Sequence, residues 1–182
     1  MKLNIKNEFR SFTVENVDAE KRTVTFAASS EYPVERYDGK NIYREILSHD
    51  PADVDMTRMN GAPLLDTHKG DVIGVVESCA IEEKRMIVTV RFGTSARAEE
   101  IFCDVKNGIR RNVSIGYLKT SVVSSRKGAD GVMEIRFRWT PYEVSMVPVP
   151  ADPTVGIGRE INLPDAMPEP EKGKVRMIII AR

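Results

Sequence analysis

The sequence has little cysteine and little histidine, with two residues of each among 182. Two cysteines cannot build a disulfide framework, and free thiols suit a reducing cytoplasm. A metal site is one alternative, and its ligands would have to come from Cys79, Cys103, His49 and His68. None of these residues forms the close pair that structural zinc sites use, so we expect no metal and no cofactor.

An excess of charge of one sign is also missing, since 27 Lys and Arg balance 27 Asp and Glu. A neutral chain is a poor candidate for sequence-independent binding to nucleic acid, which depends on basic surface. The longest apolar stretch, Met177 to Ala181, is far too short to span a membrane, and the N-terminus lacks the apolar core of a signal peptide. We therefore expect a soluble cytoplasmic protein that binds neither nucleic acid nor membrane.

Runs rich in Val, Ile, Thr and Phe, separated by turn residues, predict a mainly β protein. The expected strands are Phe9–Val17, Arg22–Ala28, Val72–Ile81, Met86–Phe92, Val113–Val123 and Val132–Val149. Ser29 to Leu47, which contains Pro33 and Gly39, is expected to be irregular. Hairpin connections favour an α+β fold built on a closed or nearly closed antiparallel β-barrel of about six or seven strands with flanking helices.

Two segments carry helix signals. Asp50 and Pro51 are good residues to begin a helix, which we expect to run to about Met59. Ser95 to Asn107 is the clearer helix, because its apolar residues recur at the spacing of one buried face. Those residues are Ala98, Ile101, Phe102 and Val105.

The composition changes near the C-terminus. Leu163 to Lys174 is rich in proline and charge, which is typical of an extended linker. We therefore divide the chain into a domain at residues 1–160 and a tail at residues 161–182.

Ser114 lies on a predicted strand whose alternation separates two faces. Val113, Ile115 and Tyr117 form the apolar face, so Ser114 and Gly116 point to the other side. Gly116 leaves room beside the hydroxyl, where the backbone of a substrate could approach. An ordinary outward-facing serine is the simpler reading of this run taken alone.

His68 and Glu143 are the other two candidates. His68 lies in a polar loop, Asp66 to Asp71, directly before a predicted strand, where reactive side chains are often held. Glu143 lies on a strand whose alternation directs it to the same side of the sheet as Ser114 if both strands belong to one barrel. A serine needs a base to take its proton, histidine titrates in the right range, and a carboxylate can orient the histidine. We therefore assign Ser114 as nucleophile, His68 as general base and Glu143 as the third member.

Five runs in the same order resemble the tailed-phage prohead (capsid-maturation) proteases, a family related to the herpesvirus assemblins. They are Glu31–Tyr37, Tyr43–Leu47, Pro63–His68 with Ile73-Gly74, Asn112–Tyr117, and Tyr142–Pro148 with Pro150–Pro153. The resemblance covers about residues 10–158 and implies a herpesvirus-protease-like barrel with the serine and histidine on its outer face. Assemblins use a second histidine as third member and an arginine pair for the oxyanion. This chain has no histidine after His68 and only Arg159 beyond Pro150–Pro153.

The resemblance further implies a serine endopeptidase that acts during phage procapsid maturation. Its substrates would be the scaffolding protein and the N-terminal segment of the major capsid protein, and it would also cut itself, with the linker after Arg159 as the hypothetical site. It implies a homodimer, located inside the procapsid in the host bacterial cytoplasm.

Two different functions stay open beside the protease. One is a Ser–Lys hydrolase with Lys69 or Lys119 as base, although alternation places Lys119 on the opposite strand face from Ser114. The second is a non-catalytic barrel of the prohead that only binds capsid or scaffold protein. Such a barrel keeps the phage context and predicts that Ser114→Ala changes nothing.

Overall fold

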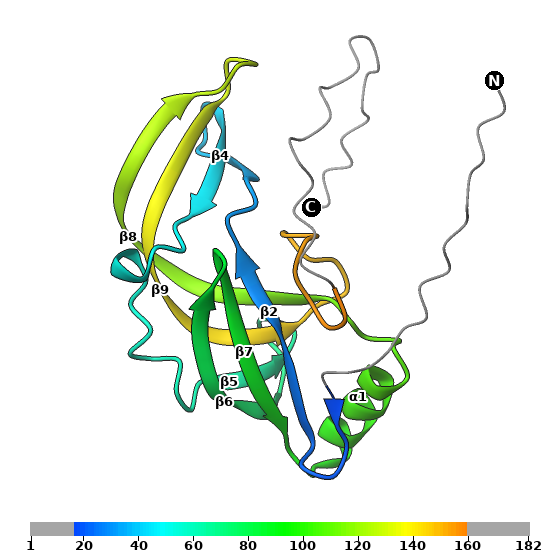
Figure 1. Cartoon of the computed structure of the whole chain (residues 1–182). Helices are drawn as coiled ribbons and strands as arrows, with labels where there is room; N and C mark the ends of the chain where they lie inside the picture. The colour runs from blue at the N-terminus through cyan, green and yellow to red at the C-terminus, as the bar shows by residue number, and fades with distance from the viewer. Residues whose placement is uncertain (1–16, 160–182) are drawn as a thin grey trace, which may run out of the picture.

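The computed structural model describes residues 17–159 and is built mainly of strands around one α-helix (Figure 1). The elements in chain order are β1 (Val17–Asp18), β2 (Thr23–Ser30), β3 (Val34–Tyr37), β4 (Ile42–Leu47), the 3₁₀ turn η1 (Pro51–Asp53), β5 (Pro63–Asp66), β6 (Val72–Glu82), β7 (Arg85–Phe92), α1 (Ala96–Lys106), β8 (Val113–Lys127) and β9 (Met133–Met146). The predicted tail from residue 161 onward, and most of the expected strand Phe9–Val17, lie outside the described residues.

The strands form one mixed sheet, not an antiparallel barrel. Neighbouring strands follow the order β1-β2-β7-β6-β5-β9-β4-β3, and β8 pairs with β9 beside this path. Within the described range this order has two ends, β1 and β3, so the sheet does not close. β9 runs parallel to both β4 and β5, whereas the other pairs are antiparallel. The prediction of a mainly β fold is confirmed, whereas the described strands form a mixed sheet that does not close instead of the expected closed or nearly closed antiparallel barrel.

β8 and β9 are long and join two halves of the molecule, as Figure 1 shows. The first part of β9 pairs with β4, from Met133 to Phe137, and its last part pairs with β5, from Val144 to Met146. The same two strands therefore belong to an upper arm with β3 and β4 and to a lower body with β5. Ser114 and Glu143 lie in the parts of β8 and β9 that belong to the lower body.

Local signals explain which helices form. Ser95 caps α1 by accepting a hydrogen bond from the Ala98 N–H, and the predicted buried face of the helix is confirmed. Asp50 caps as predicted, with its side chain accepting from the Ala52 N–H, but only the three-residue turn η1 follows. The predicted helix from Asp50 to Met59 is therefore wrong beyond Asp53.

The region expected to be irregular contains two strands. β3 and β4 pair as a hairpin, and β4 continues the sheet through β9. Asp38 closes the turn between them, since its carboxylate accepts from the N–H groups of Lys40 and Asn41. The pairing of β4 with β9, which is remote in sequence, supplies hydrogen bonds that a local pattern cannot reveal.

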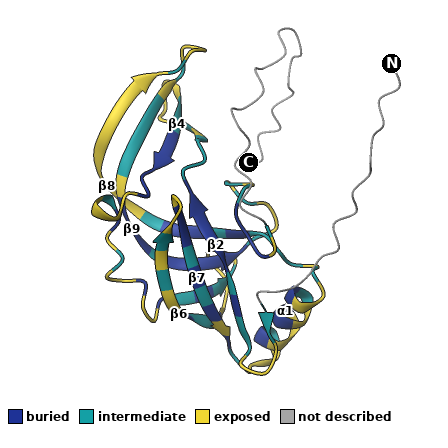
Figure 2. Cartoon of the chain, in the orientation of Figure 1, coloured by how far each residue is buried: buried dark blue, intermediate teal, exposed yellow. Residues whose placement is uncertain are grey.

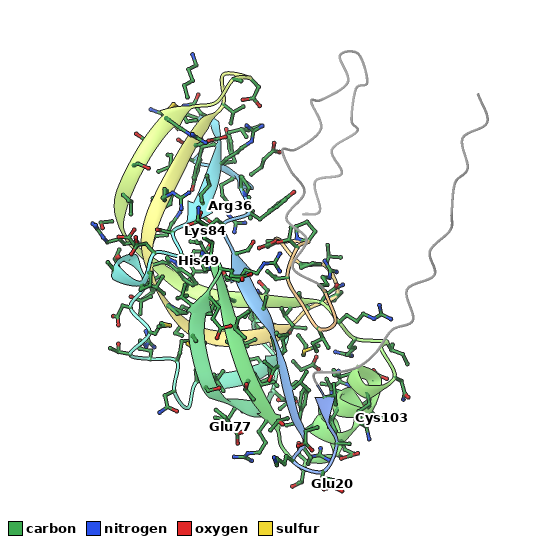
Figure 3. All side chains as sticks on the ribbon, in the orientation of Figure 1. Glu20, Arg36, His49, Glu77, Lys84 and Cys103 are labelled. Carbon is green, nitrogen blue, oxygen red and sulfur yellow. The ribbon has the colours of Figure 1, made fainter. Side chains whose placement is uncertain are left out.

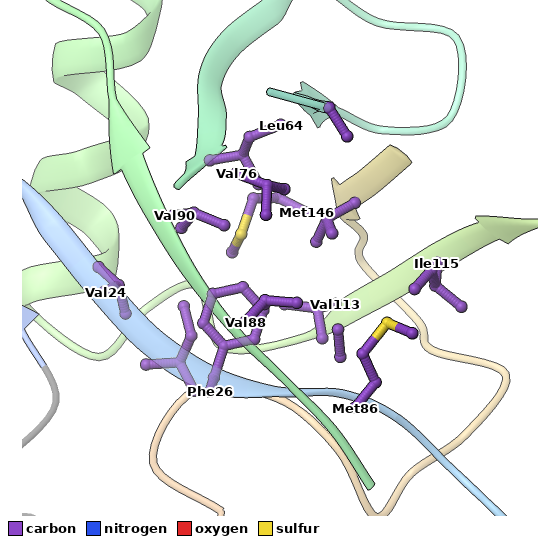
Figure 4. Packing of buried hydrophobic residues seen from close by; sticks show 14 of the residues in the cluster. Val24, Phe26, Leu64, Val76, Met86, Val88, Val90, Val113, Ile115 and Met146 are labelled. Atoms are coloured by element: carbon purple, nitrogen blue, oxygen red, sulfur yellow. The ribbon is translucent and has the colours of Figure 1, made fainter. Parts of the chain in front are cut away.

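The apolar core gathers side chains from the lower strands and from α1, and among these strands β2 and most of β7 are buried, whereas β6 is buried only in part (Figure 2). Figure 4 shows Phe26, Val88 and Met146 packing there, together with Val113 and Ile115 from the start of β8. Burying a side chain of this size contributes about 1.5–3 kcal/mol. Because Val113 and Ile115 are anchored in the core, the residue between them, Ser114, is directed to the other face of β8.

No helix among residues 17–159 is long and apolar enough to cross a membrane.

Candidate functional site

Ser114, His68 and Glu143 come from three different elements. Ser114 is the second residue of β8, Glu143 lies near the end of β9, and His68 lies in the loop after β5. In the antiparallel pairing of β8 with β9, Ser114 faces Ser145 and Gly116 faces Glu143. Ser114 and Glu143 therefore share one face of the sheet, as the alternation of side chains predicts.

The structure brings the three side chains into one hydrogen-bonded chain. His68 Nδ1 lies 2.6 Å from Glu143 Oε1, and His68 Nε2 lies 2.9 Å from Ser114 Oγ. With the proton on Nδ1, the ring donates to the carboxylate, and its bare Nε2 accepts from the serine hydroxyl. In this geometry the imidazole can take the serine proton while the carboxylate stabilises the resulting imidazolium.

Glu143 is buried, with 4% of its surface exposed, although it lies on the strand face that it shares with Ser114 and not on the apolar face. Both faces of β9 are covered at this point, because Val144 and Ser145 are also fully buried. A buried carboxylate requires hydrogen-bond partners, and His68 supplies one of them.

Ser145 supplies the other partner, and sequence reasoning missed it. Its Oγ donates a 2.6 Å hydrogen bond to Glu143 Oε2, so each carboxylate oxygen of Glu143 has a donor. Alternation along β9 already placed Ser145 on the same side as Glu143, which is the signal that could have identified it. Ser145 therefore helps to hold the Glu143 carboxylate in place.

Gly116 makes room for Glu143. A Cβ atom built on Gly116 would lie 2.2 Å from Glu143 Oε1 and 2.6 Å from its Cγ. Real Cβ atoms do not approach other atoms so closely, so a side chain at this position would displace the carboxylate. The predicted space beside Ser114 exists, and the glutamate side chain occupies it.

A cavity of about 650 Å³ opens at this site. His68, Ser114 and Glu143 line it together with apolar side chains, among which are Tyr32, Val34, Leu47, Leu65, Tyr142 and Val155. The His68 side chain is 45% exposed, so the imidazole is accessible to a molecule that enters from solvent.

Charged groups surround Glu45 where the cavity meets the upper arm. Glu45 is 3% exposed and accepts from Arg36 at 3.1 Å and from Lys119 at 2.8 Å. The Tyr117 hydroxyl also donates to Glu45, and burial together with this carboxylate raises the pKa of Tyr117 to about 12. The tyrosine therefore stays neutral at physiological pH.

The two candidate lysines and the second histidine lie outside the hydrogen-bonded chain at Ser114. Lys119 is paired with Glu45, and Lys69 is an exposed residue among those that line the cavity. His49 is 2% exposed and packs against Trp139, and Figure 3 shows it in the middle of the molecule. Among residues 17–159, no cluster of three or more His, Cys, Asp or Glu could hold a metal ion.

The chain is similar to a curated protein described as the major capsid protein of Halomonas phage phiHAP-1. The two sequences are 49% identical over 140 residues, which is 73% of this chain and 22% of that protein. This chain thus spans about a fifth of the length of the relative. No family model matches the sequence, and no solved structure matches it.

This similarity corrects the expectations that depended on the family resemblance. The relative is named as a component of the capsid and not as a protease. The predicted membership of the prohead proteases and the predicted serine endopeptidase activity are therefore wrong. The coat and scaffolding proteins lose their support as substrates, while the phage and capsid context of the prediction agrees with the relative.

Proposed function

We propose that this chain is a structural module of a bacteriophage capsid, and that its partners are capsid proteins. The observation that carries the proposal is the 49% identity to a phage major capsid protein. Because the chain corresponds to 22% of that protein's length, we assign it the role of one module of the shell and not of the whole subunit. Its place is then in the procapsid, which assembles in the host cytoplasm.

The upper arm supplies a surface that suits this role. Leu118 and Val122 on β8 are each 54% exposed, and Met133 at the start of β9 is 38% exposed. Figure 2 shows that β8 is exposed along the arm. Apolar side chains grouped on an exposed strand are typical of surfaces that contact another protein.

A chimera tests the capsid role. The region of the phiHAP-1 major capsid protein that matches this chain is replaced by the chain, and particles are counted by gradient sedimentation and electron microscopy. We expect particles at a yield close to that of the unaltered protein, and loss of particles when the region is deleted. Normal assembly of the deleted protein would refute the proposal.

A second proposal concerns the chemistry of the Ser114 site, and the hydrogen-bonded chain through His68 to the buried Glu143 supports it. We infer that Ser114 is an activated nucleophile, with His68 as its base and Glu143 as the group that orients His68. An activated serine attacks the phosphorus of a fluorophosphonate, forms the O–P bond and expels fluoride, while its proton passes to His68.

Labelling with such a probe, followed by peptide mass spectrometry, tests this centre. Ser114 is expected to carry the adduct, and His68→Ala and Glu143→Gln are expected to slow or abolish it. Ser124→Ala is the matched control, because Ser124 is an exposed serine of the same strand. An unlabelled Ser114, or labelling that is unchanged in His68→Ala, would refute the centre and leave the structural role intact.

A further inference from the structure

Against the His68 loop lies a second cavity of about 650 Å³ that is lined by arginines. Arg97, Arg110 and Arg111 contribute to its wall, together with Asp66 and Thr67 from the start of the loop. The carboxylate of Asp66 lies where Arg97 and Arg110 converge. Its side chain is only 12% exposed.

Asp66 is held from two directions. Arg97, from the first turn of α1, donates through Nε to Asp66 Oδ2 at 2.8 Å and through Nη2 to the same oxygen. Arg110, from the segment between α1 and β8, donates through Nη1 to Asp66 Oδ1 at 2.9 Å. Charge-assisted hydrogen bonds of this kind are short and directional, so they hold both carboxylate oxygens of Asp66 in place.

Asp66 and Arg110, which form an ion pair, each lie a few residues before a residue of the candidate site. Asp66 is the last residue of β5 and lies two positions before His68. Arg110 lies four positions before Ser114, at the approach to β8. The Asp66 carboxylate therefore joins the backbone that carries the base to the backbone that carries the hydroxyl.

The backbone between Asp66 and His68 is tightly constrained. Thr67 adopts a φ of 66°, which is uncommon for a residue with a branched side chain, and its N–H donates to Met146 O at 2.9 Å. Gly70 closes the loop by donating to Thr67 O at 3.2 Å. A Cβ on Gly70 would lie 1.5 Å from the Asp66 carbonyl oxygen, so the loop tolerates only glycine there. These constraints leave the backbone between Asp66 and His68 little freedom to rotate.

We propose that Asp66, clamped by Arg97 and Arg110, is a positioning residue that sets the distance between His68 Nε2 and Ser114 Oγ. The inference rests on the proposed reactive centre. The Asp66 carboxylate is then the anion that neutralises Arg97 and Arg110 in the wall of the cavity. When this side chain is removed, formate or acetate from solvent can bind between the two arginines in its place.

The full-length chain and its variants are compared by the rate of fluorophosphonate labelling at Ser114. Asp66→Asn keeps the shape of the side chain and removes its charge. We expect its labelling rate to fall roughly 10- to 100-fold, because displacements of about 1 Å at a reacting pair have effects of this size. Asp130→Asn is the matched control, because it removes the carboxylate of the ion pair between Arg44 and Asp130, which lies in the turn that joins β8 to β9. It is expected to label at the wild-type rate.

Chemical rescue separates positioning from general stability. Asp66→Gly leaves a space between the two arginines, and formate or acetate is expected to restore labelling in a saturable manner. Chloride at the same ionic strength is expected to have no such effect. Circular dichroism and urea unfolding confirm that each variant is folded, and an unfolded Asp66→Gly leaves the decision to Asp66→Asn.

A nuclear magnetic resonance readout is independent of reactivity. The chain has two histidines, so the proton on His68 Nδ1 is assigned by its loss in His68→Ala. Its low-field resonance is expected to shift or broaden in Asp66→Asn and to be unchanged in Asp130→Asn. Labelling within about twofold of wild type in a folded Asp66→Asn, with this resonance unchanged, would overturn the inference. If the wild-type chain does not label, the reactive centre itself is refuted, and the resonance alone decides whether Asp66 positions His68.

Discussion

Gly116→Ala should disconnect Glu143 from His68 without altering any of the three site residues. The new Cβ would lie 2.6 Å from Glu143 Cγ and 2.7 Å from its Cδ. Carbon atoms in contact prefer about 3.5–4.0 Å, so the glutamate has to retreat by about 1 Å. Only the carboxylate oxygens lie at the flexible end of the side chain, and a Cγ so close to the new methyl group cannot be relieved by rotating them alone.

This retreat exceeds what the hydrogen bond to His68 can absorb. The Nδ1 to Oε1 distance of 2.6 Å would lengthen to about 3.6 Å, at which no hydrogen bond remains. His68 would then lose the partner that fixes its tautomer and ring orientation. We expect the rate of Ser114 labelling to fall about 100-fold or more, close to the effect of Glu143→Gln. Overpacking should also lower the free energy of unfolding by about 1–3 kcal/mol.

The assay is the time course of fluorophosphonate labelling, with urea unfolding measured on the same preparations. Gly93→Ala is the matched control, because the nearest atoms to its new Cβ are Ile73 O at 3.5 Å and Ala98 Cβ at 3.8 Å, which are ordinary contacts. It should label at the wild-type rate. A folded Gly116→Ala that labels as fast as wild type, while Glu143→Gln is slow, would show that the crowding argument is wrong.

Three further predictions concern buried or partly buried polar groups. Tyr117 should ionise last among the tyrosines because its pKa is raised to about 12. The difference in ultraviolet absorbance between wild type and Tyr117→Phe should therefore develop above about pH 11, and a difference centred near pH 10 would contradict this. Burial lowers the pKa of His49 in the folded chain below its ordinary value of about 6.5. The unfolded chain therefore binds more protons below about pH 6.5, and the free energy of unfolding decreases as the pH falls below that value. His49→Gln should therefore flatten the pH dependence of urea unfolding between about pH 6.5 and 5, and an unchanged slope would exclude His49 as its source. Glu45→Gln should lower the free energy of unfolding by about 1–3 kcal/mol, because Glu45 is buried. The control Glu77→Gln breaks an exposed pair with Arg91 and should lower it by about 0–1 kcal/mol. Equal effects of the two substitutions would show that the burial of Glu45 is unimportant.

Elements with strong local signals were predicted from the sequence alone. α1 follows from the Ser95 cap and the apolar spacing of one helix face, and both features act within a few residues. The hairpin of β6 and β7 follows from two apolar runs around a charged turn, in which Glu83 and Lys84 adopt positive φ values. Ser114, His68 and Glu143 could be selected because their chemistry is complementary and because alternation assigns a strand face to each of the two strand residues.

The tertiary structure decided what depends on contacts between remote segments. β4 was not predicted because, beside its local pairing with β3, one of its edges pairs with β9, roughly ninety residues away, and no local pattern encodes that pairing. The short distances at the site follow from β9, which pairs with β5 before His68 and with β8 at Ser114. The burial of Glu143, its bond from Ser145 and the arginine clamp on Asp66 arise in the same way. Residue type and the alternation of side chains determined which residues could act together. The register of the long-range strand pairs determined where those residues meet, because hydrogen bonds between distant segments form only in the folded chain.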